Sequence, residues 1–307
     1  KFYFIKLNHF IKLFLLIFLL TNCDQNEELT PQTITQLQAG AGSFVYDKYL
    51  PFENKPIEVH YYIPENADQT LPILIYLHGM GRNGSGNRDA FINLANQNKF
   101  IVIVPEFSND YFPGGDSYNL ANIFIDGDNP SSETLNPSEQ WTFAVLDPLF
   151  IYFKSLISNY SDKYNLIGFS AGGQVAHRTF IYSNSNYCHQ TISMGSGWYT
   201  TINENLDFPY GLRESPYNSS LASIFSKDLT ILVGENDNDP NAPNLRRNSI
   251  VDQQGDNRFD RAEYFFSTAQ NIALQENYIF NWQKYVVPNA AHDAGLVSTY
   301  AINLLYP

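Results

Sequence analysis

The sequence is poor in cysteine and in positive charge, and each shortage excludes a class of protein. Only 2 cysteines occur among 307 residues, so we expect no internal disulfide. Lys and Arg number 18 against 31 Asp and Glu, which gives a formal net charge of −13. No run of Lys or Arg follows residue 12, which argues against nucleic acid as a partner, because phosphate binding needs clustered positive charge.

Long apolar runs are also scarce, and the one at the N-terminus has the pattern of an export signal. Lys1, Lys6 and Lys12 precede the run LFLLIFLL at residues 13–20. Eight apolar residues are too few for a bilayer span, which takes about 20. The run is soon followed by Cys23, as in bacterial lipoprotein signals. We therefore predict a signal peptide over residues 1–23 with a lipid on Cys23, and plain secretion is the alternative.

The rest of the chain is predicted to be a tether followed by one domain. Residues 24–42 are polar and aperiodic, as in a flexible tether. A hydrophobic content of 44% suffices for one sizeable core, and no linker interrupts the chain after residue 43. We expect a single catalytic domain at 43–307, a monomer, that the lipid holds at the cell envelope.

Strand and helix patterns alternate through this domain. Continuous apolar runs predict buried parallel strands, whereas apolar spacings of three and four residues predict helices. Two runs at 43–51 and 56–64 come without a helix and predict an antiparallel start. The alternation indicates an α/β fold with a mostly parallel central sheet of about eight strands flanked by helices. The further strands are expected at 71–79, 100–107, 164–170, 189–196, 229–237 and 281–289, and the helices at 87–98, 140–157, 171–182, 261–274 and 294–305.

The sharpest chemical signal is Gly-Phe-Ser-Ala-Gly at residues 168–172, between a predicted strand and a predicted helix. G-x-S-x-G in this setting is a nucleophile elbow, a tight turn that presents the serine hydroxyl above the sheet. Ser170 is therefore the candidate nucleophile. The alternative is a glycine-rich turn with a spectator serine.

The loop directly after the strand residues 71–77 carries a second signal, His78-Gly79-Met80-Gly81. In such folds this loop supplies one backbone N–H to an oxyanion hole, and the residue after the nucleophile supplies the other. We predict that these donors are the N–H groups of Met80 and Ala171. His78 is expected to orient the loop.

An acid and a base follow in the order that a serine triad on this fold requires. Asp237 is the preferred acid in the turn at 234–239, which follows the strand residues 229–233, with Asp239 and Glu235 as alternatives. A solvated acidic turn or a weak calcium site is the other explanation of this cluster. His292 is the only histidine after Asp237 and hence the candidate base. These residues imply acyl transfer without a metal or an organic cofactor.

With these motifs assembled, the chain resembles the poly(3-hydroxybutyrate) depolymerase and feruloyl-esterase-like branch of the α/β hydrolases. The resemblance rests on LPILIYLHGMGRNG, FIVIVPEF and YNLIGFSAGG, followed by the acidic turn and the late histidine. It implies an extracellular serine esterase that acts on a polyester, on an ester linked to polysaccharide, or on a similar small ester. The alternatives are a serine peptidase of the prolyl-oligopeptidase type and a non-catalytic surface lipoprotein that binds ligands on a hydrolase scaffold.

Two long irregular stretches, 108–138 and 197–227, are expected to border the pocket above the strand ends. Trp198, Tyr199 and Tyr111 are the candidate substrate-binding residues there. Packing in the core or in a lid is the alternative for these rings. The segment 246–259 is unusually polar and is predicted to be no more than a surface loop.

Overall fold

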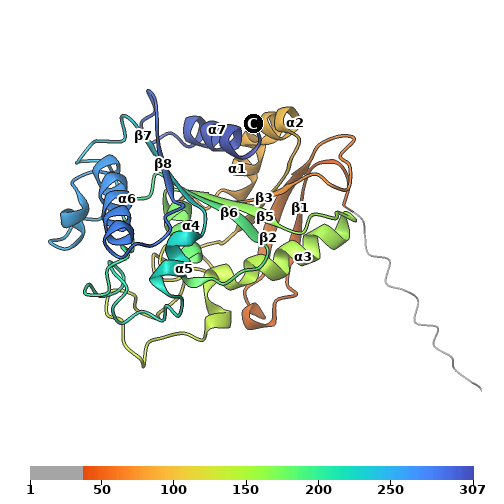
Figure 1. Ribbon diagram of the computed structural model, residues 1–307. Helices are drawn as coiled ribbons and strands as arrows, with labels where there is room; N and C mark the ends of the chain where they lie inside the picture. Colours follow the sequence, from red (N-terminus) through yellow and green to blue (C-terminus); the bar gives the residue numbers. More distant parts are fainter. Residues whose placement is uncertain (1–36) are drawn as a thin grey trace, which may run out of the picture. The chain divides into compact units, whose positions relative to one another are not determined.

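The computed structural model describes residues 37–307, and one eight-stranded sheet runs through them (Figure 1). The predicted signal, the lipid on Cys23 and most of the predicted tether lie outside the described residues. The first strand begins at Gly40, inside the segment predicted as tether. The first strand thus starts slightly earlier than the hydrophobic pattern indicates, because it alternates exposed and half-buried residues over most of its length.

The sheet has the strand order β1-β2-β4-β3-β5-β6-β7-β8. Strands β1, β2 and β4 pair antiparallel, and every other pair is parallel. The antiparallel start and the mostly parallel sheet are as predicted. The strands are β1 Gly40–Tyr46, β2 Ile57–Ile63, β3 Ile73–Leu77, β4 Ile101–Glu106, β5 Tyr164–Phe169, β6 Cys188–Met194, β7 Leu229–Gly234 and β8 Gln283–Val287.

Helices cover both faces of this sheet (Figure 1). One face carries α1 (Gly84–Ala90), α2 (Ile92–Asn98) and α7 (Ala294–Leu305), and the other carries α3 to α6. Each face buries its own apolar cluster, because a strand covered on both sides must be apolar on both sides. The helices of the second face are α3 Leu146–Leu156, α4 Ala171–Tyr182, α5 Leu221–Ser226 and α6 Arg258–Gln275.

Helix α4 lies deepest, since all 12 of its residues are buried. It packs against β3, β5 and β6, directly behind the turn that contains Ser170. The elbow is therefore held between the centre of the sheet and a buried helix. A nucleophile in this position sits on a rigid support.

Two of the predicted helices differ from the observed ones. The helix expected at 140–157 begins only at Leu146, after short 3-10 turns at Ser138–Gln140 and Thr142–Val145. Pro148 then falls in the first turn of α3, where its missing N–H breaks no intrahelical bond. The helix expected at 87–98 is divided at Phe91 into α1 and α2.

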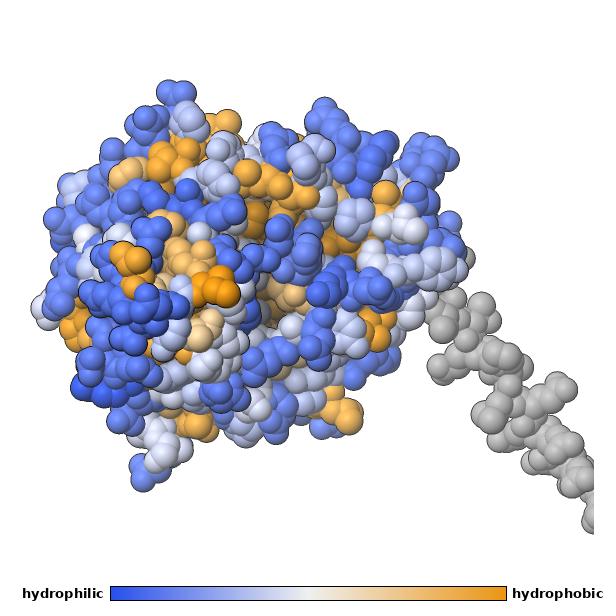
Figure 2. Space-filling model, in the orientation of Figure 1, coloured by the Kyte–Doolittle hydropathy of each residue, from blue (hydrophilic) through white to orange (hydrophobic). Residues whose placement is uncertain are grey.

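On the face shown in Figure 2, hydrophilic residues predominate and hydrophobic ones form small separate patches. Over residues 37–307, none of the helices combines the length and the apolarity needed to cross a membrane.

Candidate active site

Three strands of the parallel part of the sheet, β5, β7 and β8, deliver the predicted nucleophile, acid and base to one edge of the sheet. Ser170 follows β5, Asp237 lies just after β7, and His292 lies in the turn after β8. Strands β5 to β8 are parallel, so their carboxyl ends meet at the same edge. Ligand sites of open α/β sheets lie at that edge.

The three side chains form a continuous hydrogen-bonded chain. His292 Nε2 lies 3.1 Å from Ser170 Oγ, and His292 Nδ1 lies 2.7 Å from Asp237 Oδ2. A carboxylate can only accept, so Nδ1 carries the ring proton and Nε2 is free to accept the serine proton. Asp237 is only 5% exposed, whereas the His292 side chain is 29% exposed and faces the cavity described below.

The backbone at Ser170 is strained, as expected of a nucleophile elbow. Its φ of 57° and ψ of −114° lie outside the regions that L-residues favour. Close packing allows no side chain at the glycines around it. A Cβ on Gly172 would lie 2.0 Å from the Leu77 carbonyl oxygen, and one on Gly168 would lie 2.2 Å from the Gly172 oxygen. The G-x-S-x-G pattern is thus required by contacts between backbones.

His78 holds the loop after β3, as the sequence predicts. Its Nε2 accepts the Phe107 N–H at 3.0 Å, so Nδ1 carries the proton and donates to the Gly79 carbonyl at 2.9 Å. The ring also stacks on Tyr118, whose hydroxyl donates to the His78 carbonyl at 2.6 Å. Burial lowers the pKa of His78 to about 4, so the ring is neutral at physiological pH. A buried neutral ring with both nitrogens engaged is a structural support and not a base.

A cavity of about 360 Å³ opens beside Ser170 and His292. Both predicted oxyanion residues, Met80 and Ala171, line it, and the Met80 residue is 56% exposed. Ala171 is the first residue of α4, where a helix leaves backbone N–H groups unpaired and favours negative charge. The other lining residues are Asn119, Gln174, Gly197, Trp198, Pro243, Asn244, Arg246 and Arg258.

The three predicted substrate-binding aromatics have different positions. Trp198 lines the cavity, as expected. The prediction for Tyr199 is wrong: its side chain is fully buried and stacks on Phe265, with ring centroids 4.5 Å apart. Tyr111 is 39% exposed but is not among the residues that line this cavity.

The geometry also distinguishes the three acidic candidates after β7. Asp237 contacts the histidine, whereas Asp239 Oδ1 accepts the Asn241 N–H at 2.8 Å and Glu235 Oε2 accepts the Asn289 N–H at 2.9 Å. Within residues 37–307 no group of three or more His, Cys, Asp or Glu is placed to hold a metal ion, so the calcium alternative gains no support there.

Two arginines in the cavity wall were not anticipated from the sequence. Arg246 and Arg258 belong to the polar segment that was predicted to be only a surface loop. Arg258 Nη1 lies 3.5 Å from Asp237 Oδ1, so the acid is held from both sides. No periodicity marks these residues, because Arg246 lies in a loop and Arg258 is only the first residue of α6.

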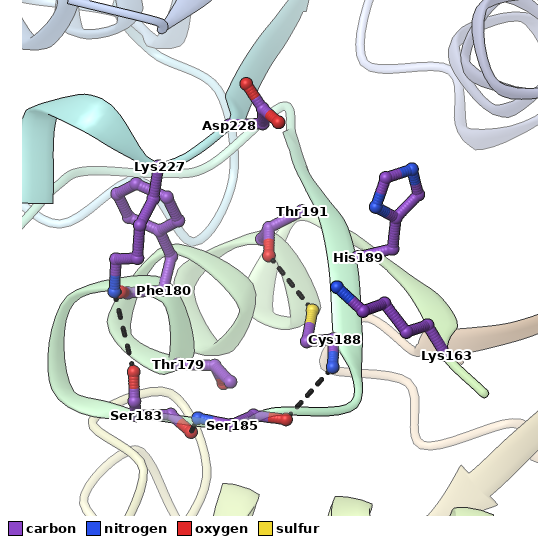
Figure 3. Close-up of a pocket in the computed structure, with 10 residues that line it drawn as sticks. All are labelled: Lys163, Thr179, Phe180, Ser183, Ser185, Cys188, His189, Thr191, Lys227 and Asp228. Atoms are coloured by element: carbon purple, nitrogen blue, oxygen red, sulfur yellow. Dashed lines mark hydrogen bonds between the residues drawn. The ribbon is translucent and has the colours of Figure 1, made fainter. Parts of the chain in front are cut away.

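A second cavity, of about 400 Å³, lies around Cys188 and Lys227 (Figure 3). It is formed by the last turn of α4 and the starts of β6 and β7, and hence lies at the opposite edge of the sheet. Burial raises the pKa of the Cys188 thiol to about 11, so little thiolate is present at neutral pH. A buried thiol that stays protonated is a poor nucleophile.

Similarity to solved structures identifies the family to which the chain belongs. No family model and no curated protein matches the chain. Among solved structures, poly(aspartic acid) hydrolase-1 from Sphingomonas sp. KT-1 is 33% identical, with a TM-score of 0.82 over 88% of this chain and 100% of that one. The chain belongs to the α/β-hydrolase superfamily. The predicted fold class and the predicted family are thereby confirmed.

A further solved relative of this hydrolase is LpqC, a poly(3-hydroxybutyrate) depolymerase from Bordetella parapertussis. It is 28% identical, with a TM-score of 0.80 over 88% of this chain and 90% of that one. An S-formylglutathione hydrolase from Agrobacterium tumefaciens shares the fold at 13% identity and a TM-score of 0.53. The prediction that the chain is an enzyme, a hydrolase of the ester-hydrolase class, is confirmed.

Proposed function

We propose that this hydrolase is a serine esterase in which Ser170 is the nucleophile, His292 the base and Asp237 the acid that orients the base. The observation that carries the proposal is the unbroken chain of hydrogen bonds at 3.1 and 2.7 Å between the three side chains. His292 takes the Ser170 proton as the hydroxyl attacks the ester carbonyl. It then returns the proton to the leaving alcohol, which gives an acyl-enzyme.

Water completes the cycle by the same route. His292 removes a proton from water, the hydroxide attacks the acyl-enzyme, and the proton returns to Ser170 as the carboxylic acid leaves. The N–H groups of Met80 and Ala171 are the proposed donors to the oxyanion in both steps. Loss of one such donor costs about 10²–10³ in turnover.

The proposed substrate is a carboxylic ester. It belongs to a polyester, to an ester group linked to polysaccharide, or to a small ester molecule. An amide is the second candidate, because poly(aspartic acid) hydrolase-1 is the relative with 33% identity. The sequence pattern before residue 24 supports an envelope protein anchored by a lipid on Cys23, with secretion as the alternative. Incorporation of labelled palmitate into the chain, but not into Cys23→Ser, tests the anchor.

Hydrolysis of p-nitrophenyl acetate and butyrate by the full chain tests the triad. We expect Ser170→Ala to lower kcat by several orders of magnitude and Ser219→Ala, at a serine far from the three strand ends, to leave it unchanged. A fluorophosphonate probe should label the parent and not Ser170→Ala. An unlabelled and inactive parent would rule out the serine-esterase proposal.

A further inference from the structure

The cavity beside Ser170 is positively lined, although the protein carries a net charge of −13. Apart from the titratable His292, the only ionisable residues that line it are Arg246 and Arg258, and none of its lining residues is Asp or Glu. An ester that carries no charged group forms no ion pair with these two arginines. The positive lining therefore indicates a substrate with a negatively charged group.

Arg258 has an unused donor at this site. Its side chain is 6% exposed, its Nη1 lies 3.5 Å from Asp237 Oδ1, and its Nη2 donates to the Pro243 carbonyl at 3.4 Å. Its buried Nε finds no hydrogen-bond partner within residues 37–307. Arg258 thus brings a guanidinium to the cavity wall whose hydrogen-bonding capacity is only partly used by the contacts with Asp237 and Pro243.

Arg246 lies in the cavity wall against aromatic rings. Its guanidinium lies 5.0 Å from the centroid of the Trp198 ring and 5.3 Å from that of Tyr210. Its ion-pair partner is Asp128, whose side chain is 49% exposed. An exposed carboxylate binds weakly, so a ligand carboxylate can share or replace it.

Arg178 adds positive charge behind the same ring. Its guanidinium is fully buried 4.6 Å from the Trp198 centroid, and its Nη2 has no partner in the described part of the chain. Its other bonds go to neutral oxygens, those of Thr200, Asn119 and Gln174, so no carboxylate in residues 37–307 is paired with it. Burial lowers its pKa to about 9, which still leaves it charged at neutral pH. A buried unpaired cation is stabilised by an anion nearby.

We propose that the cavity binds a carboxylate of the substrate through Arg246 and Arg258, close to the bond that Ser170 attacks. The inference rests on the proposed function and names its substrate class: esters that carry a free carboxylate, such as half-esters of dicarboxylic acids or acidic polymers. Guanidinium forks match the planar carboxylate and form charge-assisted bonds with it. Arg246 and Arg258 are then specificity-determining residues.

A matched pair of substrates tests this. Monoethyl adipate and ethyl hexanoate have the same acyl chain length and differ by a terminal carboxylate in place of a methyl group. We expect the parent to favour monoethyl adipate by about 10- to 100-fold in kcat/KM, the worth of a charge-assisted contact. Arg246→Gln should lower this ratio at least tenfold. Arg247→Gln is the matched control, because Arg247 pairs with Asp252 and Asp256 and does not line the cavity.

Binding provides a readout that does not depend on turnover. Calorimetry with glutarate and the Ser170→Ala protein should show saturable binding that weakens as salt is added and disappears in Ser170→Ala/Arg246→Gln. Equal kcat/KM for the two esters, or glutarate binding that survives the loss of Arg246, overturns the carboxylate site while the esterase proposal stands. An inactive parent that still binds glutarate through Arg246 supports the site and overturns the esterase. An inactive parent that binds no glutarate overturns both.

Discussion

Asp237 and Asp239 are two residues apart and have different surroundings. Asp237 is 5% exposed and contacts both His292 and Arg258, whereas Asp239 caps its own turn in solvent. Only Asp237 can hold the imidazole with its proton on Nδ1.

Asp237→Asn should therefore lower kcat for p-nitrophenyl butyrate by about 10⁴, since an amide at this place favours the wrong tautomer. Asp239→Asn, the matched control, should keep kcat within about twofold. Similar losses in the two variants would show that the turn as a whole, and not the contact with His292, matters.

At this scale the sequence predicts chemistry better than environment. The candidate triad of Ser170, Asp237 and His292 could be predicted from their order in the chain, because the fold brings the carboxyl ends of parallel strands to one edge of the sheet. The burial of Tyr199 could not be predicted, because two adjacent aromatic residues in an irregular loop do not indicate which of them faces the core. Arg246 and Arg258 could not be predicted as site residues either. They lie in a polar segment, and their place in the cavity depends on contacts with Trp198 and Asp237, which are distant in the chain.

The turn between β5 and α4 is fixed by close backbone packing on both sides. Its backbone approaches the end of β3 so closely that only glycine fits at 172. The strain at Ser170 persists because the buried helix behind it leaves no room to relax.

Gly172→Ala should accordingly destabilise the fold by about 3 kcal/mol or more, because its Cβ would collide with a backbone oxygen of β3. Urea titration measures the change. Gly115→Ala is the control, since a Cβ there meets nothing within 4 Å, and it should change stability by less than about 0.5 kcal/mol. A small effect at 172 would mean that the turn can shift without cost.

Among elements, strands were more predictable than helix starts. Continuous apolar runs locate β3, β4, β5 and β7 to within a few residues. The start of α3 was misplaced because the apolar spacing continues through the 3-10 turns before Leu146, and those turns bury Phe143 and Val145 just as a helix would. The short α5 fell inside a stretch expected to be irregular, since six residues are too few to show a period.

Over the whole molecule, two buried histidines tie stability to pH. Burial lowers the pKa of His78 to about 4 and that of His177 well below its ordinary value, so the native state keeps both rings neutral. The unfolded chain binds protons at these rings near pH 6.5, so it takes up more protons than the native state below that pH. The free energy of unfolding should fall as pH drops from about 6.5 to about 4.

His78 alone should account for on the order of 3 kcal/mol of this loss. Urea titrations at pH 7 and pH 4.5 measure this loss of unfolding free energy. The carboxylates also titrate in this range, but they are the same in every variant and so contribute equally. His78→Asn should show a shallower pH dependence than the parent, while the exposed His189→Asn should match the parent. A parent whose stability rises on acidification would contradict the prediction.

Ser170 and the proposed base His292 are 122 positions apart in the chain, and β8, which precedes His292, is the last strand and forms one edge of the sheet. During synthesis or refolding, a chain ordered only through β7 has the elbow and the acid but no proton acceptor. Catalysis by the proposed triad therefore requires β8 to be in place. In a refolding experiment the return of turnover should report the docking of β8. A delay of turnover behind the spectroscopic signals of the central strands would measure how long that docking takes.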